Sequence, residues 1–277
     1  MAVFFNVHPA TVFGIATGFS LVIFFAIRLL LHFFYVKVFG KRPFISRRVE
    51  AIRKRGLPLV KKYQPWLGAR MTVYPDTVDM LMENVAYLYS TGFNQFIIGP
   101  SYGPKWDEKA FADYEEQLDK IGDFYLEKKR NREPFRMNFF ESKSGDRFCA
   151  SNMWGCRAGR TGATVSASGK IYPCSKFLGL SSFDENLYCL GDVYTGITNL
   201  DAREEFVGMS IEQFSECIDC DAADYCSGGC PANNYNDRGC VSKPSPFDCA
   251  MAKIDKRVLQ RFDEKYKDSL DEKVEVT

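Results

Sequence analysis

Histidine is almost absent from this chain of 277 residues. Its two histidines, His8 and His32, both lie in the apolar N-terminal region, so the remaining chain has no imidazole with which to bind a metal or move protons. Net charge is also nearly absent, since 36 Lys and Arg face 35 Asp and Glu. A net charge of +1 gives the molecule no overall attraction to nucleic acid, and we expect no nucleic-acid partner.

Cysteine, in contrast, is concentrated in the second half of the chain. Thiolates are soft donors, and four of them can close a site for zinc or for an iron-sulfur cluster. Disulfides are the alternative, but the chain is long and 26% charged, and we expect no cleavable signal peptide. These features favour metal ligation. The ten cysteines are Cys149, Cys156, Cys174, Cys189, Cys217, Cys220, Cys226, Cys230, Cys240 and Cys249.

An uncharged run extends from Pro9 to Ile27. As a helix it would span about 28 Å, close to the thickness of a bilayer core. Residues 37–62 then carry many Lys and Arg but one acid, Glu50, whereas no Lys or Arg precedes the run. The positive-inside rule therefore predicts a single-pass membrane protein with its N-terminus outside and its soluble part cytoplasmic. The basic residues suit anionic lipid head groups better than a nucleic acid because they adjoin an apolar span.

The middle of the chain alternates between strand-like and helix-like segments. Apolar runs predict strands at residues 68–74, 93–98 and 135–140, and helical spacing of apolar residues predicts helices at 76–92 and 107–130. Asp76 is the predicted N-cap of the first helix. This βαβαβ order is typical of parallel strands covered by helices. Two such units cannot close a barrel, so the sheet either stays open or is completed from outside this chain.

Two elements position cysteines in the last part of the chain. Residues 164–167 and 170–173 flank Ser168-Gly169, a two-residue turn signal, and predict a β-hairpin whose return strand ends at Cys174. Residues 246–270 predict a helix that carries Cys249 in its first turn and turns Ile254, Val258 and Phe262 inward.

Two further groups of residues carry weaker expectations. Tyr102, Trp106 and Trp154 could line a peptide groove, although single aromatic residues near strand ends more often belong to the core. The acidic residues between 107 and 123 are expected to be the solvated face of a helix.

The cysteine spacing resembles a known family. Cys156, Gly169-x4-Cys174, Cys217-x2-Cys220-x5-Cys226-x3-Cys230 and Cys249 look like the seven-cysteine SPASM domain, which follows the barrel of radical S-adenosylmethionine (SAM) enzymes that modify peptides and proteins. The sequence Gly228-Gly229-Cys230-Pro231 is similar to the usual end of that run. Residues 70–130 also resemble the last part of the radical SAM barrel, so the resemblance covers about residues 63–265.

The resemblance implies two auxiliary [4Fe-4S] clusters. In the anaerobic sulfatase-maturating members an extra cysteine precedes the seven, and Cys149 would fill that place. Cys189 and Cys240 are left over and are expected to be buried free thiols, although Cys240 could substitute for Cys249. Cluster I would be bound by Cys149, Cys156, Cys174 and Cys230, and cluster II by Cys217, Cys220, Cys226 and Cys249.

The chain departs from the family at the catalytic cluster. Radical SAM enzymes bind that cluster with a CxxxCxxC motif, and no such motif occurs in this sequence. Ser175 stands where the sulfatase-maturating members carry a catalytic aspartate. No catalytic residue can therefore be assigned, and we expect no SAM cleavage by the chain alone.

Together these features predict an α+β protein. Its expected parts are a transmembrane anchor (residues 1–36), a basic juxtamembrane linker (37–65), a partial (β/α) barrel-like segment (66–148), an iron-sulfur SPASM domain (149–265) and a tail (266–277). The expected function is electron transfer or peptide holding beside a partner radical SAM enzyme that acts on a peptide or protein. Two alternatives stay open: a truncated or split piece of a radical SAM peptide-modifying enzyme, and a structural zinc protein with two four-thiolate sites.

Overall fold

The structure is a computed structural model that describes residues 56–142, 154–180 and 185–274. The chain divides into two compact units, Met1–Leu67 and Gly68–Thr277. In the first unit, residues 56–63 form a helix. The predicted membrane anchor and most of the basic linker lie outside the described residues. In the ranges that the structure describes, no helix combines the length and the apolar character needed to cross a membrane.

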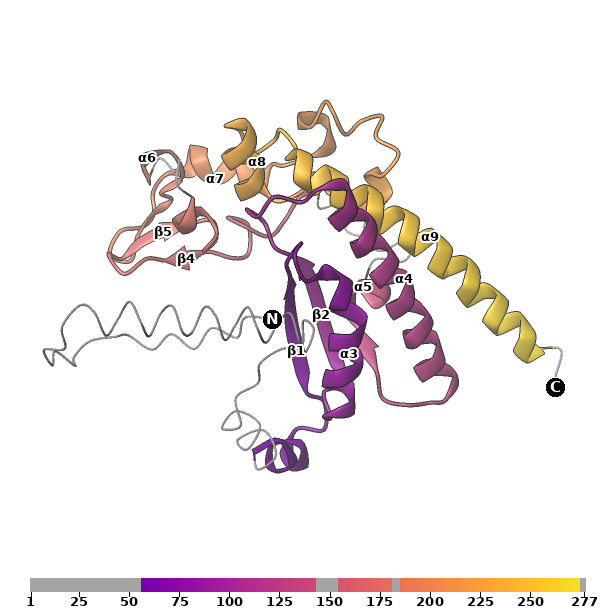
Figure 1. The fold of residues 1–277 in the computed structure, drawn as a ribbon. Helices are drawn as coiled ribbons and strands as arrows, with labels where there is room; N and C mark the ends of the chain where they lie inside the picture. The colour runs from indigo at the N-terminus through magenta and orange to yellow at the C-terminus, as the bar shows by residue number, and fades with distance from the viewer. Residues whose placement is uncertain (1–55, 143–153, 181–184, 275–277) are drawn as a thin grey trace, which may run out of the picture. The chain divides into compact units, whose positions relative to one another are not determined.

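The second unit begins with a three-stranded parallel sheet of order β1-β2-β3. Figure 1 shows helices α3 and α4 beside this sheet. The order of strands and helices and the parallel pairing agree with the predicted βαβαβ segment. The mixed α/β character of this part is therefore confirmed. The elements are β1 (Gly68–Val73), the short 3-10 turn η1 (Val78–Met80), α3 (Leu81–Ser90), β2 (Gln95–Pro100), α4 (Glu108–Arg130), β3 (Arg136–Met137) and α5 (Asn138–Ser142).

The two faces of this sheet differ in burial. Successive side chains of a strand point to opposite faces. Met71 and Phe96 are therefore buried in the core beneath the helices, whereas Arg70 and Thr72 are exposed and Ile97 keeps 43% of its surface accessible. The core side of the sheet is continuous with the apolar faces of α3 and α4.

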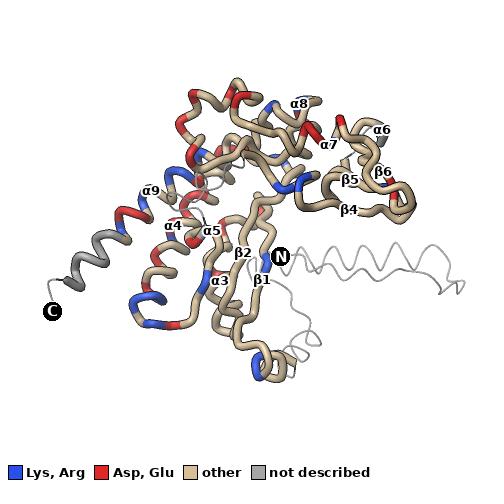
Figure 2. The backbone as a smooth tube through the Cα atoms, turned by 180° about the vertical axis from the view of Figure 1, so that it is seen from behind, with Lys and Arg blue, Asp and Glu red and all other residues tan. Residues whose placement is uncertain are grey.

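Helix α9 (Pro246–Val274) packs along α4. At Gly122 of α4 a Cβ atom would lie 3.3 Å from the ring of Phe262 on α9 and 3.2 Å from that of Phe140 on α5. Ile254, Val258 and Phe262 are buried, as predicted. Ion pairs join the two helices along their contact, and basic residues of α9 are visible beside α4 in Figure 2. The pairs are Glu115 with Arg257 (3.0 Å), Asp119 with Arg261 (2.8 Å) and Asp123 with Lys265 (2.7 Å).

The expectation that the acidic residues of α4 are only a solvated face is therefore wrong for Glu115 and Asp119, which are partly buried, whereas Asp123 keeps 59% of its side chain exposed. Each pair joins residues 142 positions apart, so the two helices run in the same direction with matched four-residue steps. Exposed pairs of this kind add little stability each, but they fix the register of one helix on the other.

The cysteine-rich part contains a four-stranded antiparallel sheet of order β4-β5-β6-β7. The predicted hairpin is present, but its turn is longer than two residues, because the N–H of Ser166 already donates to the carbonyl of Lys170 at 2.8 Å. Phe177, Phe206 and Phe214 are almost fully buried in a second apolar core. The elements are β4 (Thr164–Val165), β5 (Lys170–Tyr172), η2 (Phe177–Gly179), α6 (Glu185–Tyr188), β6 (Gly191–Asp192), β7 (Gly196–Ile197), α7 (Leu200–Val207), η3 (Ile211–Gln213), η4 (Ala223–Tyr225) and α8 (Pro231–Arg238).

Two local predictions around the first sheet are wrong, and a third is shifted by two residues. Residues 135–140 do not form one strand, because β3 has only two residues and helix α5 follows it at once. Asp76 is not a helix N-cap, since the chain first makes the turn η1, whose N-cap is Thr77. The strand predicted at residues 93–98 begins and ends two residues later than expected.

Leu118 offers a test of the core between α4 and its neighbours. It is fully buried, whereas Lys120 on the same helix is half exposed and forms an ion pair with Glu116. We expect Leu118→Ala to lower the free energy of unfolding by about 2–5 kcal/mol, because the substitution leaves a cavity. The control Lys120→Ala should change it by less than about 1 kcal/mol. Urea unfolding followed by circular dichroism measures both, and equal effects would contradict this packing.

Candidate metal centre

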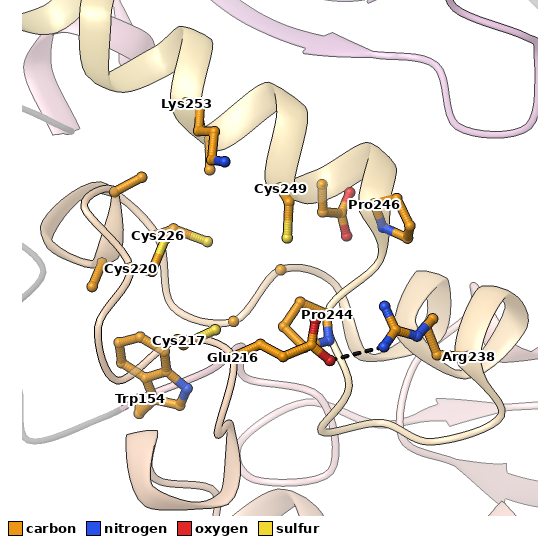
Figure 3. Close-up of a pocket in the computed structure, with 16 residues that line it drawn as sticks. Trp154, Glu216, Cys217, Cys220, Cys226, Arg238, Pro244, Pro246, Cys249 and Lys253 are labelled. Carbon is orange, nitrogen blue, oxygen red and sulfur yellow. Dashed lines mark hydrogen bonds and ion pairs between the residues drawn. The ribbon is translucent and has the colours of Figure 1, made fainter.

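Four cysteines line one cavity in the cysteine-rich part of the second unit. The cavity has a volume of about 330 Å³, and Cys217, Cys220, Cys226 and Cys249 are in its wall. Figure 3 shows the side chains of Cys217, Cys226 and Cys249 directed toward the same space. These are the four residues assigned from the sequence to cluster II.

Consecutive turns place the first three of these cysteines. The N–H of Cys217 donates to the carbonyl of Phe214 at 2.7 Å, and that of Cys220 to the carbonyl of Cys217 at 3.2 Å. A further turn ends at Cys226, whose N–H donates to Ala223 at 3.3 Å. Because each turn reverses the chain within three residues, thiols spaced along the sequence reach one wall of the cavity.

The loop that closes the cavity requires glycine. Gly228 has φ of +85°, and a Cβ atom there would lie 2.6 Å from the ring of Phe214. Asn234 of α8, which is fully buried, holds the loop from the other side. Its amide donates to the carbonyls of Gly228 (2.8 Å) and Val241 (2.9 Å) and accepts from the N–H of Ser245 (2.8 Å). The loop is thus fixed without any contribution from sulfur.

Cys249 comes from the first turn of α9, next to Asp248. The carboxylate of Asp248 accepts from the N–H of Cys230 at 2.7 Å and from the amide of Asn233 at 2.8 Å. Burial raises the pKa of this carboxyl group above its usual range, against the lowering effect of these hydrogen bonds. Asp248 also lines the cavity, so it touches both the four-cysteine wall and the backbone of Cys230.

The four thiols influence one another electrostatically. Burial raises the pKa of Cys217 to about 11, and nearby Cys226, Cys249 and Cys220 add to this shift. Burial also raises the pKa of Cys249, followed by the effects of Cys226 and Cys220. Without a bound metal these two thiols therefore hold their protons at neutral pH, and ligation would release them.

A second group consists of Cys156, Cys174 and Cys230. Burial raises the pKa of the Cys156 thiol, and Cys230 and Cys174 are the next acidic groups to raise it. The sulfur of Cys156 accepts a hydrogen bond from the N–H of Ala158 at 3.2 Å. These three are the described members of the predicted cluster I. The fourth, Cys149, lies outside the described residues.

Cys189 and Cys240 lie elsewhere. The thiol of Cys189 donates to the carbonyl of Gly191 at 3.4 Å, and that of Cys240 lies 3.2 Å from the hydroxyl of Ser242. Both are partly buried free thiols, and neither lines the cavity. Cys249, not Cys240, therefore completes the wall.

The sulfur atoms surround a space and do not converge on a point. In the described ranges no three histidine, cysteine, aspartate or glutamate side chains are arranged to hold a metal ion. Which residues ligate a metal thus stays a prediction. What the structure adds is the common cavity of one predicted quartet and the proximity of three members of the other.

Several residues of the cavity were not predicted from the sequence. Glu216 pairs with Arg238 at 2.8 Å, and Lys253 of α9 adds a second cation to the wall. Trp154, considered only as a groove or core residue, also lines the cavity (Figure 3). The cysteine spacing does not point to Asp248. Its place directly before Cys249, in the first turn of a predicted helix, is the sequence feature that could have drawn attention to it.

The loop after β2 is tied to α8 by a polar junction. Tyr102 donates from its hydroxyl to Asp237, and the amide of Asn236 donates to Tyr102 at 2.7 Å. Burial raises the pKa of Tyr102 to about 12, and the bond to Asp237 adds to the shift. Trp106 is a core residue whose indole donates to the carbonyl of Ser101 at 3.0 Å. The groove role considered for these two aromatics gains no support.

Comparison with solved structures shows that the chain shares its fold with part of another protein. No family model matches the chain. The structure of native anSMEcpe with bound AdoMet superimposes with a TM-score of 0.53 at 19% identity, covering 78% of this chain and 61% of that one. The structure of native anSMEcpe with AdoMet and the Cp18Cys peptide gives a TM-score of 0.50 at 18% identity, covering 78% and 62%. At these identities the likeness concerns the fold alone.

An uncharacterized protein from Archaeoglobus fulgidus is 35% identical over 92 residues, which are 33% of this chain and 21% of that protein. The chain thus spans about three fifths of the anSMEcpe structures and about one fifth of the archaeal protein. The fold is shared with an AdoMet-binding protein, over part of that protein's length.

Asp248 offers a test of the link between the two cysteine groups. We expect Asp248→Ala to lower the free energy of unfolding of the metal-free protein by about 1–3 kcal/mol, because two buried donors lose their acceptor. Asp219→Ala is the matched control, since Asp219 is exposed between Cys217 and Cys220. Denaturant unfolding under anaerobic conditions measures both. Equal stability of the two variants would contradict the role assigned to the carboxylate.

Proposed function

We propose that this chain is an iron-sulfur protein with a SPASM-like domain that holds two auxiliary [4Fe-4S] clusters. Cluster I would use Cys149, Cys156, Cys174 and Cys230, and cluster II would use Cys217, Cys220, Cys226 and Cys249. Its role would be electron transfer, or holding a peptide, beside a separate radical SAM enzyme. When bound, such clusters supply one-electron redox chemistry.

The observation that carries this proposal is the single cavity lined by four cysteines from separate segments. The fold likeness to anSMEcpe with bound AdoMet supports the same relationship. The cysteine spacing supplies the link between the two, because it resembles the domain that carries auxiliary clusters in radical SAM enzymes.

The residues of the cavity fit an iron-sulfur cluster better than one zinc ion. Zinc binds four thiolates at about 2.3 Å and therefore needs sulfur atoms that converge on one point. Here the four thiols line a space of about 330 Å³, and no ion-sized group of ligands is present among the described residues. A cluster several atoms wide matches that arrangement. Lys253 in the same wall would offset part of its negative charge, whereas Arg238 is paired with Glu216.

Membrane attachment is part of the proposal. The uncharged run from Pro9 to Ile27 and the basic residues after it would anchor the chain with its cysteine-rich part in the cytoplasm. A reducing cytoplasm would keep the thiols available for iron. A partner enzyme with a CxxxCxxC motif would act on the same peptide or protein substrate.

A second candidate is a piece of a longer or split radical SAM enzyme. The chain spans about three fifths of anSMEcpe, and its parallel sheet has three strands among the described residues. The exposed side chains Arg70, Thr72 and Ile97 leave one face of that sheet open in the second unit. Parallel sheets are normally covered on both faces, so this sheet has the features of an incomplete one.

Metal analysis tests the first proposal. Anaerobic reconstitution of the full chain should give about eight iron and eight sulfide per molecule and broad visible absorption. Cys226→Ala should remove about half of the iron, whereas the control Cys240→Ala should keep all of it. About two zinc ions in a colourless protein would contradict the proposal and favour the structural zinc alternative.

SAM cleavage tests whether the chain acts alone. With dithionite as reductant, we expect no release of 5′-deoxyadenosine above background, because the sequence lacks CxxxCxxC. A complete radical SAM enzyme in the same assay is the positive control, and chromatography measures the product. Cleavage by the chain alone would overturn this account. Modification of a peptide substrate that requires both this chain and a partner enzyme would support the partner role.

A further inference from the structure

The indole nitrogen of Trp154 is a buried donor with no acceptor among the residues that the structure describes. Its ring lines the cavity together with Cys217, Cys220, Cys226 and Cys249. A buried N–H group without a partner costs about 1–3 kcal/mol. Such a donor in the wall of a cavity points to an acceptor that the cavity itself would receive.

The ring is held in a fixed position beside Cys217. It packs edge-on against Phe214, with ring centroids 5.9 Å apart, and the carbonyl of Phe214 accepts from the N–H of Cys217. The next residue, Gly155, has φ of +85°, and a Cβ atom there would lie 2.7 Å from the sulfur of Met209. Contacts within the protein therefore set the position of the ring.

The two carboxylates in the cavity wall already accept hydrogen bonds from other groups. Glu216 accepts from Arg238 at 2.8 Å, and the carboxylate of Asp248 accepts from Cys230 and Asn233. The same wall carries the sulfur atoms of four cysteines, and a cluster bound there would add its own sulfurs as acceptors. In Figure 3 the indole nitrogen lies on the ring edge turned to Cys217 and Glu216.

We propose that Trp154 donates a hydrogen bond from Nε1 to a sulfur atom of the iron-sulfur group held by Cys217, Cys220, Cys226 and Cys249, and thereby raises its reduction potential. This inference rests on the proposed function. A donor to sulfur stabilises the reduced state, which carries one more negative charge, more than the oxidised state. Trp154 is thus a positioning and tuning residue for that group.

Trp154→Phe tests the inference in the full reconstituted chain, because it keeps an aromatic ring and removes the N–H. The reduction equilibrium constant of one couple should fall about threefold to tenfold, which is about 30–60 mV for one electron. That couple should be the one absent from Cys226→Ala. The matched control is Trp66→Phe, which lies outside the cavity and should shift neither couple. A redox titration followed by electron paramagnetic resonance measures these potentials.

A second measurement covers the case in which Trp154→Phe fails to assemble. Pulsed electron paramagnetic resonance of the reduced wild-type protein, grown with ¹⁵N-indole tryptophan, should show a weak nitrogen coupling to the cluster. Unchanged potentials in Trp154→Phe, or no ¹⁵N coupling in the wild type, would overturn the inference while leaving the proposed function intact. A chain that binds no iron would overturn both.

Discussion

The hydrogen bond between the Cys230 N–H and the Asp248 carboxylate is the contact on which the arrangement of the cysteines depends. Cys230 lies with Cys156 and Cys174, whereas Asp248 directly precedes Cys249 in the wall of the other group. One short bond of 2.7 Å therefore fixes the spacing between the two groups. A charge-assisted bond to a buried carboxylate is among the stronger polar contacts in a protein.

Helix α9 connects this hydrogen bond to the rest of the second unit. It carries Asp248 and Cys249 at its start and then packs along α4, which covers the parallel sheet. Its ion pairs with α4 set the register, and the Tyr102 junction adds a link between the loop after β2 and α8. Contacts of α9 and α8 thus connect the cysteine-rich part to the helices beside the sheet within the second unit.

Local patterns predicted the elements whose signal is contained in a few neighbouring residues. The βαβαβ order, the hairpin before Cys174 and the inward face of α9 all follow from spacing within about twenty residues. Strand β3 was overestimated because its apolar run continues into α5, where Phe139 and Phe140 are buried by helix packing. Strands β6 and β7 have two residues each, too few to leave a pattern.

The parts of the site that sequence could not predict depend on distant contacts. The ligand quartets came from a family resemblance, but the sequence does not indicate that Asp248 accepts from the backbone of Cys230, or that Arg238 and the indole of Trp154 line the same cavity. The pairs between α4 and α9 join residues 142 positions apart, so each charge looks solvated when it is considered alone. Such contacts leave no periodic trace in the sequence, and only the folded chain brings them together.

The cavity keeps its form by contacts that do not involve sulfur. Four thiolates in one partly buried wall would repel one another, and burial together with the neighbouring thiols raises the pKa of Cys217 and of Cys249. Gly228 against Phe214 and the three hydrogen bonds of Asn234 hold the loop instead. In small zinc domains the metal supplies the folding energy. Here the contacts that hold the backbone of the cavity are made by residues other than the four cysteines.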